Sequence, residues 1–68
     1  MNKINKSVYV LAGNIDELPF YYGGYFQKGN PCVVFDIESA AMFSTHENAL
    51  IVAKYAEGFD IKEHTINK

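Results

Sequence analysis

The stretch FYYGGYF, residues 20–26, decides the fold because it concentrates five of the ten Phe and Tyr residues of the chain. Aromatic side chains favour β-strands. The Gly23-Gly24 pair within the stretch has two interpretations. It can form a bulge inside one long strand, or it can form a type I′ hairpin turn that pairs Tyr22 with Tyr25.

The residues that follow favour the bulge. QKGNP, residues 27–31, is a better turn, because Gly29 and Asn30 tolerate positive φ and the proline can begin a strand. A second turn so close to Gly23-Gly24 would leave no room for a strand between them. We therefore expect residues 20–26 to form one bulged strand, with the hairpin as the alternative.

Other segments predict the remaining strands. SVYVLAG (7–13) is apolar at both parities, which is typical of a central strand. Further expected elements are a polar loop (14–19), a strand (32–36), a short helical turn (37–42) and a final strand (59–66), after which Asn67 and Lys68 are expected to fray.

A helix is predicted before the last strand. Ser44 and Glu47 have the spacing of a capping box, in which each side chain satisfies a free amide of the first turn. The helix is expected to continue through Lys54, and Gly58 is a natural stop. Its apolar face is expected to consist of Ala49, Val52, Ala53 and Ala56.

These elements give the order β-β-β-α-β in a single domain, residues 1–68. We expect an α+β fold: a small, mainly antiparallel sheet of three to four strands with one helix packed on one face. The core is expected to include Phe20, Tyr22, Phe26, Phe35, Phe59 and the two valines of the first strand, Val8 and Val10. The opposite parity would then form an uncovered face with Tyr9, Leu11, Tyr21, Tyr25 and Val34.

An uncovered tyrosine-rich face predicts a protein interface, since Tyr is enriched where proteins meet. Tyr9, Leu11, Tyr21 and Tyr25 are therefore the candidate partner-binding residues. The partner is either another protein or a second copy of the chain in a homodimer. The alternative is that the N-terminal segment or loop 14–19 covers this face.

Composition argues against other classes of partner. The net charge is −2, and the chain has six Lys and no Arg, so it lacks the basic stripe of a nucleic-acid-binding protein. Base stacking on Tyr21 and Tyr25 is therefore a minor hypothesis. The single cysteine and the polar N-terminus indicate a cytoplasmic protein without a signal peptide. No apolar run is long enough to span a membrane.

Few residues suggest chemistry. Cys32, His46, His64 and Asp36 show no spacing typical of a nucleophile with its base, and no metal-binding motif is present. Gly23-Gly24 is not a phosphate-binding loop, which needs a longer glycine pattern at the start of a helix. We therefore expect neither an enzyme nor a cofactor.

Four segments resemble small proteins encoded by bacteriophages and prophages: VYVL (8–11), FYYGG (20–24), ESAAMFSTHENAL (38–50) and FDIKEHTI (59–66). The third strand departs from that pattern, with Phe35 where a Trp is usual. The resemblance implies a β-β-β-α-β fold and an origin in a mobile element, and it transfers no site residue. It favours a non-enzymatic accessory protein in a bacterial host cell that inhibits a host enzyme or defence system, of which an anti-CRISPR is one example.

Overall fold

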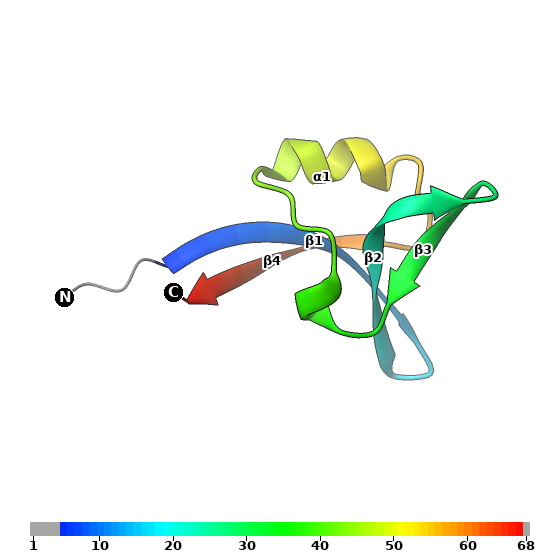
Figure 1. Ribbon diagram of the computed structural model, residues 1–68, viewed down its shortest axis with the longest axis horizontal. Helices are drawn as coiled ribbons and strands as arrows, with labels where there is room; N and C mark the ends of the chain where they lie inside the picture. Colours follow the sequence, from blue (N-terminus) through cyan, green and yellow to red (C-terminus); the bar gives the residue numbers. More distant parts are fainter. Residues whose placement is uncertain (1–4, 68) are drawn as a thin grey trace.

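The computed structural model describes residues 5–67, which form a four-stranded antiparallel sheet and one α-helix (Figure 1). The spatial order of the strands is β3-β2-β1-β4. This confirms the predicted α+β class and the β-β-β-α-β order. The elements are β1 (Asn5–Ile15), β2 (Leu18–Gln27), β3 (Asn30–Val34), the short 3-10 helix η1 (Ile37–Ser39), α1 (His46–Ala53) and β4 (Asp60–Asn67).

A tight turn joins β1 to β2, where a polar loop over residues 14–19 was expected. Ile15 pairs with Leu18, so the loop contains only Asp16 and Glu17. Their φ angles are +52° and +67°, as a type I′ turn requires. The prediction of a six-residue loop was wrong because this turn lacks the glycine or asparagine that normally marks the type.

The glycine pair forms a bulge, as predicted. Tyr22 pairs with Val33 and Phe26 pairs with Pro31, so residues 23–25 lie opposite Cys32 alone. Gly24 has a φ of +107°, which a residue with a side chain rarely adopts. The strand continues through the bulge, and the alternative hairpin at Gly23-Gly24 does not form.

The second hairpin turns at Lys28 and Gly29, whose φ angles are +53° and +82°. Asn30, expected within this turn, instead begins β3 by pairing with Gln27. As a result, β3 runs two residues earlier than the predicted strand 32–36. It ends before Phe35, which is 65% exposed, so its predicted place in the core was wrong.

The chain leaves β3 because Asp36 caps η1. The Asp36 carboxylate accepts a hydrogen bond from the backbone N–H of Glu38 at 3.2 Å. This local bond offers the backbone an alternative to extending the strand. The short helical turn expected within 37–42 is thereby confirmed, and it carries Ile37 and Ala40 onto the sheet.

The register of β1 against β2 decides which residues share a face. Ala12 lies opposite Tyr21, and Tyr21 is buried with Val10 and Ala40. Leu11 is buried on the other face, with Tyr22 and the helix residue Ala49. The expected grouping of Val8 and Val10 with Tyr22 was therefore wrong, because a shift of one residue moves every side chain of a strand to the other face.

Helix α1 begins one residue later than predicted. The side chain of its N-cap residue, Thr45, accepts a hydrogen bond from the N–H of Asn48 at 3.1 Å. The capping pair is therefore Thr45 with the third helical residue, and not Ser44 with Glu47. Of the predicted helix face, Ala49 is fully buried, and Val52 and Ala53 pack against the same cluster. Lys54 is the C-cap, so the helix ends at Ala53, and the buried Ala56 lies in the turn beyond it. Leu50, expected beside this face, is 42% exposed.

The segment after η1 fills a gap between two strands. Beyond Tyr21, β2 diverges from β1, and residues 41–43 occupy the space. The backbone of Phe43 exchanges two hydrogen bonds of 2.8 Å with Tyr9, and the N–H of Ala41 donates to the C=O of Tyr22 at 2.9 Å. This segment satisfies backbone groups that would otherwise lack partners.

Strand β4 pairs with β1 from Asn5 to Ala12, so it forms one edge of the sheet, and β3 forms the other. Asn67 pairs with Asn5, which extends β4 beyond the predicted strand. Lys68, also expected to fray, lies outside the described residues. Figure 1 shows α1 across β1 and β4, with the β2–β3 hairpin projecting to the right.

Candidate functional site

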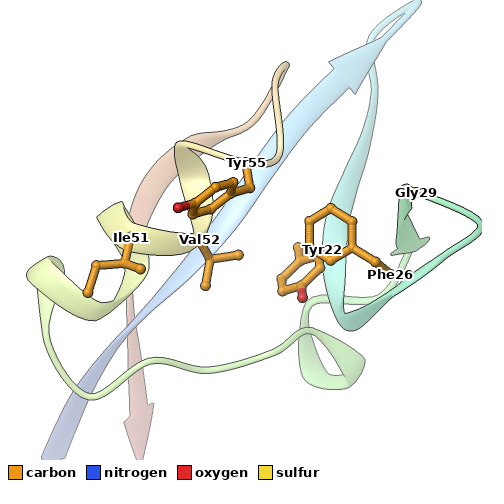
Figure 2. Close-up of a pocket in the computed structure, with 6 residues that line it drawn as sticks. All are labelled: Tyr22, Phe26, Gly29, Ile51, Val52 and Tyr55. Atoms are coloured by element: carbon orange, nitrogen blue, oxygen red, sulfur yellow. The ribbon is translucent and has the colours of Figure 1, made fainter.

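An open apolar groove of about 530 Å³ lies between α1 and the β2–β3 hairpin (Figure 2). Volumes of roughly 300–1,000 Å³ are typical of binding sites. In Figure 2, residues of β2 and its turn lie on one side and residues of the helical segment on the other. The lining residues are Tyr22, Phe26, Gly29, Ile51, Val52 and Tyr55.

Aromatic stacking holds the floor of the groove in place. The side chain of Tyr22 is only 5% exposed and stacks on Phe43, with ring centroids 6.4 Å apart and ring planes within 9°. Phe26 contacts the same tyrosine, with centroids 5.7 Å apart. Such aromatic pairs contribute about 0.5–1.5 kcal/mol each beyond area burial. The floor is therefore preorganised before anything binds.

The opposite wall is apolar and largely exposed. Ile51 and Tyr55 are 57% and 76% exposed. Ile51 lies on α1, and Tyr55 lies in the turn that directly follows the helix, where its N–H donates to the C=O of Val52 at 2.9 Å. The helix already buries Ala49 against the sheet, so Ile51 and Tyr55 form a second apolar stripe along α1 and its following turn, together called the helical segment. An exposed stripe beside a stacked aromatic floor is typical of an interaction surface.

Two of the predicted partner-binding residues are buried, so the uncovered face expected for them does not exist. Leu11 is 0% exposed, and Tyr21 is 8% exposed. Helix α1 covers Leu11 through Ala49, and the segment at Ala40 covers Tyr21. The four candidates do not form one surface, because Leu11 and Tyr21 belong to opposite faces.

The other two predicted residues lie apart. Tyr9 is half-buried, and its ring meets that of His46 edge to face, with centroids 5.7 Å apart. Tyr25 is 62% exposed. A side-chain hydrogen bond with the Cys32 thiol raises the pKa of the Tyr25 phenol above its ordinary value. Tyr25 is thus the predicted residue most available to a partner, and it is not among those that line the groove.

The residues with chemical potential are separated by the topology. Cys32 lies on β3 and His64 on β4, at opposite edges of the sheet. His46 begins α1. Besides Tyr25, the Cys32 thiol has Gln27 as a neighbour, with Sγ 3.8 Å from the amide oxygen. Within residues 5–67, no group of three His, Cys, Asp or Glu residues is placed to hold a metal ion.

Sequence reasoning missed Ile51 and Tyr55 and misplaced Phe26. Phe26 was expected in the core, but it is 40% exposed beside the groove. The available signal was a helix that is apolar on two sides. The described residues form only one α-helix. An apolar helix residue that lies outside the buried alanine face therefore has no second helix to pack against, and it is left exposed.

Comparison with known proteins adds no identification: no family model, curated protein or solved structure matches the chain. Over residues 5–67, no helix has the length and apolar character needed to cross a membrane.

Proposed function

We propose that the protein works by binding another protein, and that the groove between α1 and the β2–β3 hairpin is the binding surface. The observation that carries this proposal is the exposed apolar wall of Ile51 and Tyr55 facing a stacked aromatic floor. Protein interfaces are enriched in aromatic residues at their buried centre. A Tyr ring supplies contact area while its hydroxyl keeps a hydrogen-bond partner.

The shape of the groove favours an apolar side chain or a short apolar segment of the partner. Its lining is apolar, and the wall residues Ile51 and Tyr55 are largely exposed, so an inserted apolar group would gain contact with both. Residues that fill such a desolvated pocket usually carry most of the binding free energy. Tyr55 is 76% exposed, and it therefore has the most surface to gain from contact.

In the cell, we propose a non-enzymatic accessory role for a phage or prophage protein, with a host enzyme or a host defence system as its target. The resemblance of residues 8–11, 20–24, 38–50 and 59–66 to small phage-encoded proteins supports this origin. The small domain and the apolar groove support inhibition by occupation of a partner surface. An anti-CRISPR activity is one form that this role could take.

The test compares substitutions inside and outside the groove. Tagged wild-type protein is used to capture partners from a bacterial lysate, and the captured protein is then purified and titrated. We expect Tyr55→Glu and Ile51→Glu to weaken binding at least tenfold, because a charge in an apolar contact is left unpaired. Tyr25→Glu is the matched control, since it places the same charge at an exposed tyrosine outside the groove.

Two results contradict the proposal. One is full affinity in both groove variants. The other is loss of binding in Tyr25→Glu alone, which would place the interface around Tyr25 and Cys32. Circular dichroism of each variant establishes that it is folded before its affinity is compared.

A further inference from the structure

The two edges of the sheet differ in how they are protected. Natural proteins place charged residues on exposed edge strands to prevent pairing with other chains. Three of the eight residues of β4 are charged: Asp60, Lys62 and Glu63. The five residues of β3, Asn30–Val34, include none. In the described part of the chain, no further strand pairs with the outer side of β3.

The register shows which backbone groups of β3 point outward. The C=O of Tyr22 accepts a hydrogen bond from Ala41, so the backbone of Tyr22 faces away from β3. Antiparallel pairs alternate between hydrogen-bonded and non-hydrogen-bonded, and the pair of Tyr22 with Val33 is therefore non-hydrogen-bonded. It follows that the N–H and C=O of Val33 point outward. By the same alternation, the backbone of Pro31 also faces outward, whereas Phe35 lies in the bend that follows β3.

The side chains beside these groups are exposed and apolar. Val33 is 44% exposed and Phe35 is 65% exposed. Pro31 has no N–H, so this edge offers one donor fewer than an ordinary strand. Within β3, the free edge therefore presents one outward N–H group, on Val33, and two outward C=O groups, on Pro31 and Val33.

The charges nearest to β3 are arranged asymmetrically. Lys28 precedes the strand, and Asp36 and Glu38 follow it. All three are exposed. If a second copy pairs in the antiparallel direction, the basic end of each β3 lies beside the acidic end of the other. The two-fold symmetry gives two such contacts. A parallel copy would place like charges together, which is destabilising.

We propose that two copies of this chain associate through antiparallel pairing of their β3 edges, with a two-fold axis at Val33. The N–H and C=O of Val33 bond reciprocally to those of Val33 of the partner subunit. Pro31 lies two residues from the axis and has no N–H to donate, so this reciprocal pair carries the backbone bonding within β3.

This pairing also covers part of the exposed Val33 side chain, since Val33 comes to lie opposite its own copy. Directly opposite side chains contribute about 0.2–1 kcal/mol per pair. The interface is isologous and closes as a dimer. It is separate from the groove function proposed above, because it uses the outer edge of β3 and none of the residues that line the groove.

Charge substitutions at the axis test the proposal. In sedimentation experiments at high micromolar concentration, the wild-type protein is expected to have the mass of a dimer. The fraction of dimer is expected to fall in high salt. Val33→Lys and Val33→Glu should each be monomeric, because two like charges would face each other across the axis. An equimolar mixture of the two variants should restore a dimer, which also shows that both are folded.

Backbone amide exchange locates the contact. The Val33 N–H should exchange more slowly as concentration rises, whereas the Val34 N–H, which faces β2, should not change. A wild type that stays monomeric over this range overturns the proposal, as does a Val33→Lys protein that dimerises like the wild type. A mixture that fails to form the heterodimer also overturns it. Groove variants such as Tyr55→Glu should dimerise normally, so failure here leaves the groove function standing.

Discussion

Substitution of Leu11 tests the register of β1 most directly. The parity pattern of the sequence placed Leu11 on a partner-binding face, whereas the structure buries its side chain completely. It lies with Tyr22 beneath Ala49 of α1. The two arrangements predict opposite results for Leu11→Ala: little change in stability for an exposed contact residue, and severe destabilisation for a core residue.

The magnitude follows from full burial. Leu11→Ala removes three carbon atoms, which at about 0.8 kcal/mol each amounts to about 2.4 kcal/mol of lost transfer free energy. The remaining cavity brings the usual total to about 2–5 kcal/mol. A single core in a domain of this size rarely supplies more than about 3–5 kcal/mol. We therefore expect Leu11→Ala to be largely unfolded at 25 °C.

Urea and thermal denaturation, followed by circular dichroism, measure this effect. Leu11→Met keeps the side-chain volume and should cost less than about 1.5 kcal/mol. Tyr25→Ala is the exposed control and should stay within about 0.5 kcal/mol of the wild type. A Leu11→Ala protein that unfolds at the wild-type urea midpoint would refute the register and return Leu11 to the surface.

Two further substitutions test local structure through the free energy of unfolding in urea. Thr45→Ala should lower it by about 1 kcal/mol because Thr45 is the N-cap of α1, while Ser44→Ala should leave it nearly unchanged; the reverse result would restore the Ser44–Glu47 capping box. Glu17→Gly should raise it by about 0.5–1 kcal/mol, since a side chain at positive φ is strained and glycine relieves that strain at some cost in chain entropy; an unchanged or lower value would argue against the type I′ turn.

Local patterns were sufficient where the deciding interactions are close in sequence. The glycine bulge was predictable because the better turn at residues 27–31 competes with Gly23-Gly24 only a few positions away. The alanine face of α1 was predictable from helical spacing alone. The one-residue error at the N-cap arose because Ser44 and Thr45 are both good capping residues, and the path of the chain after Phe43 decides between them.

The candidate site could not be predicted in the same way. The groove combines Tyr22 and Phe26 of β2 with Ile51 and Tyr55 of the helical segment, and nothing in the sequence brings these elements together. The free edge of β3 likewise depends on strand order, which places β3 outermost. The uncharged composition of the strand was visible, but its position at an edge was not.

The sequence by itself determined the kinds of elements, their order and the α+β class, because strand propensity, turn chemistry and helical periodicity are local properties. Only the tertiary structure decided which face each strand residue occupies. The face that a residue occupies depends on the register of its strand. The register of β1 was set by a two-residue turn at Asp16 and Glu17, which the local composition does not predict. That turn placed Leu11 and Tyr21 in two separate parts of the core, and the exposed apolar residues of the groove lie beside α1.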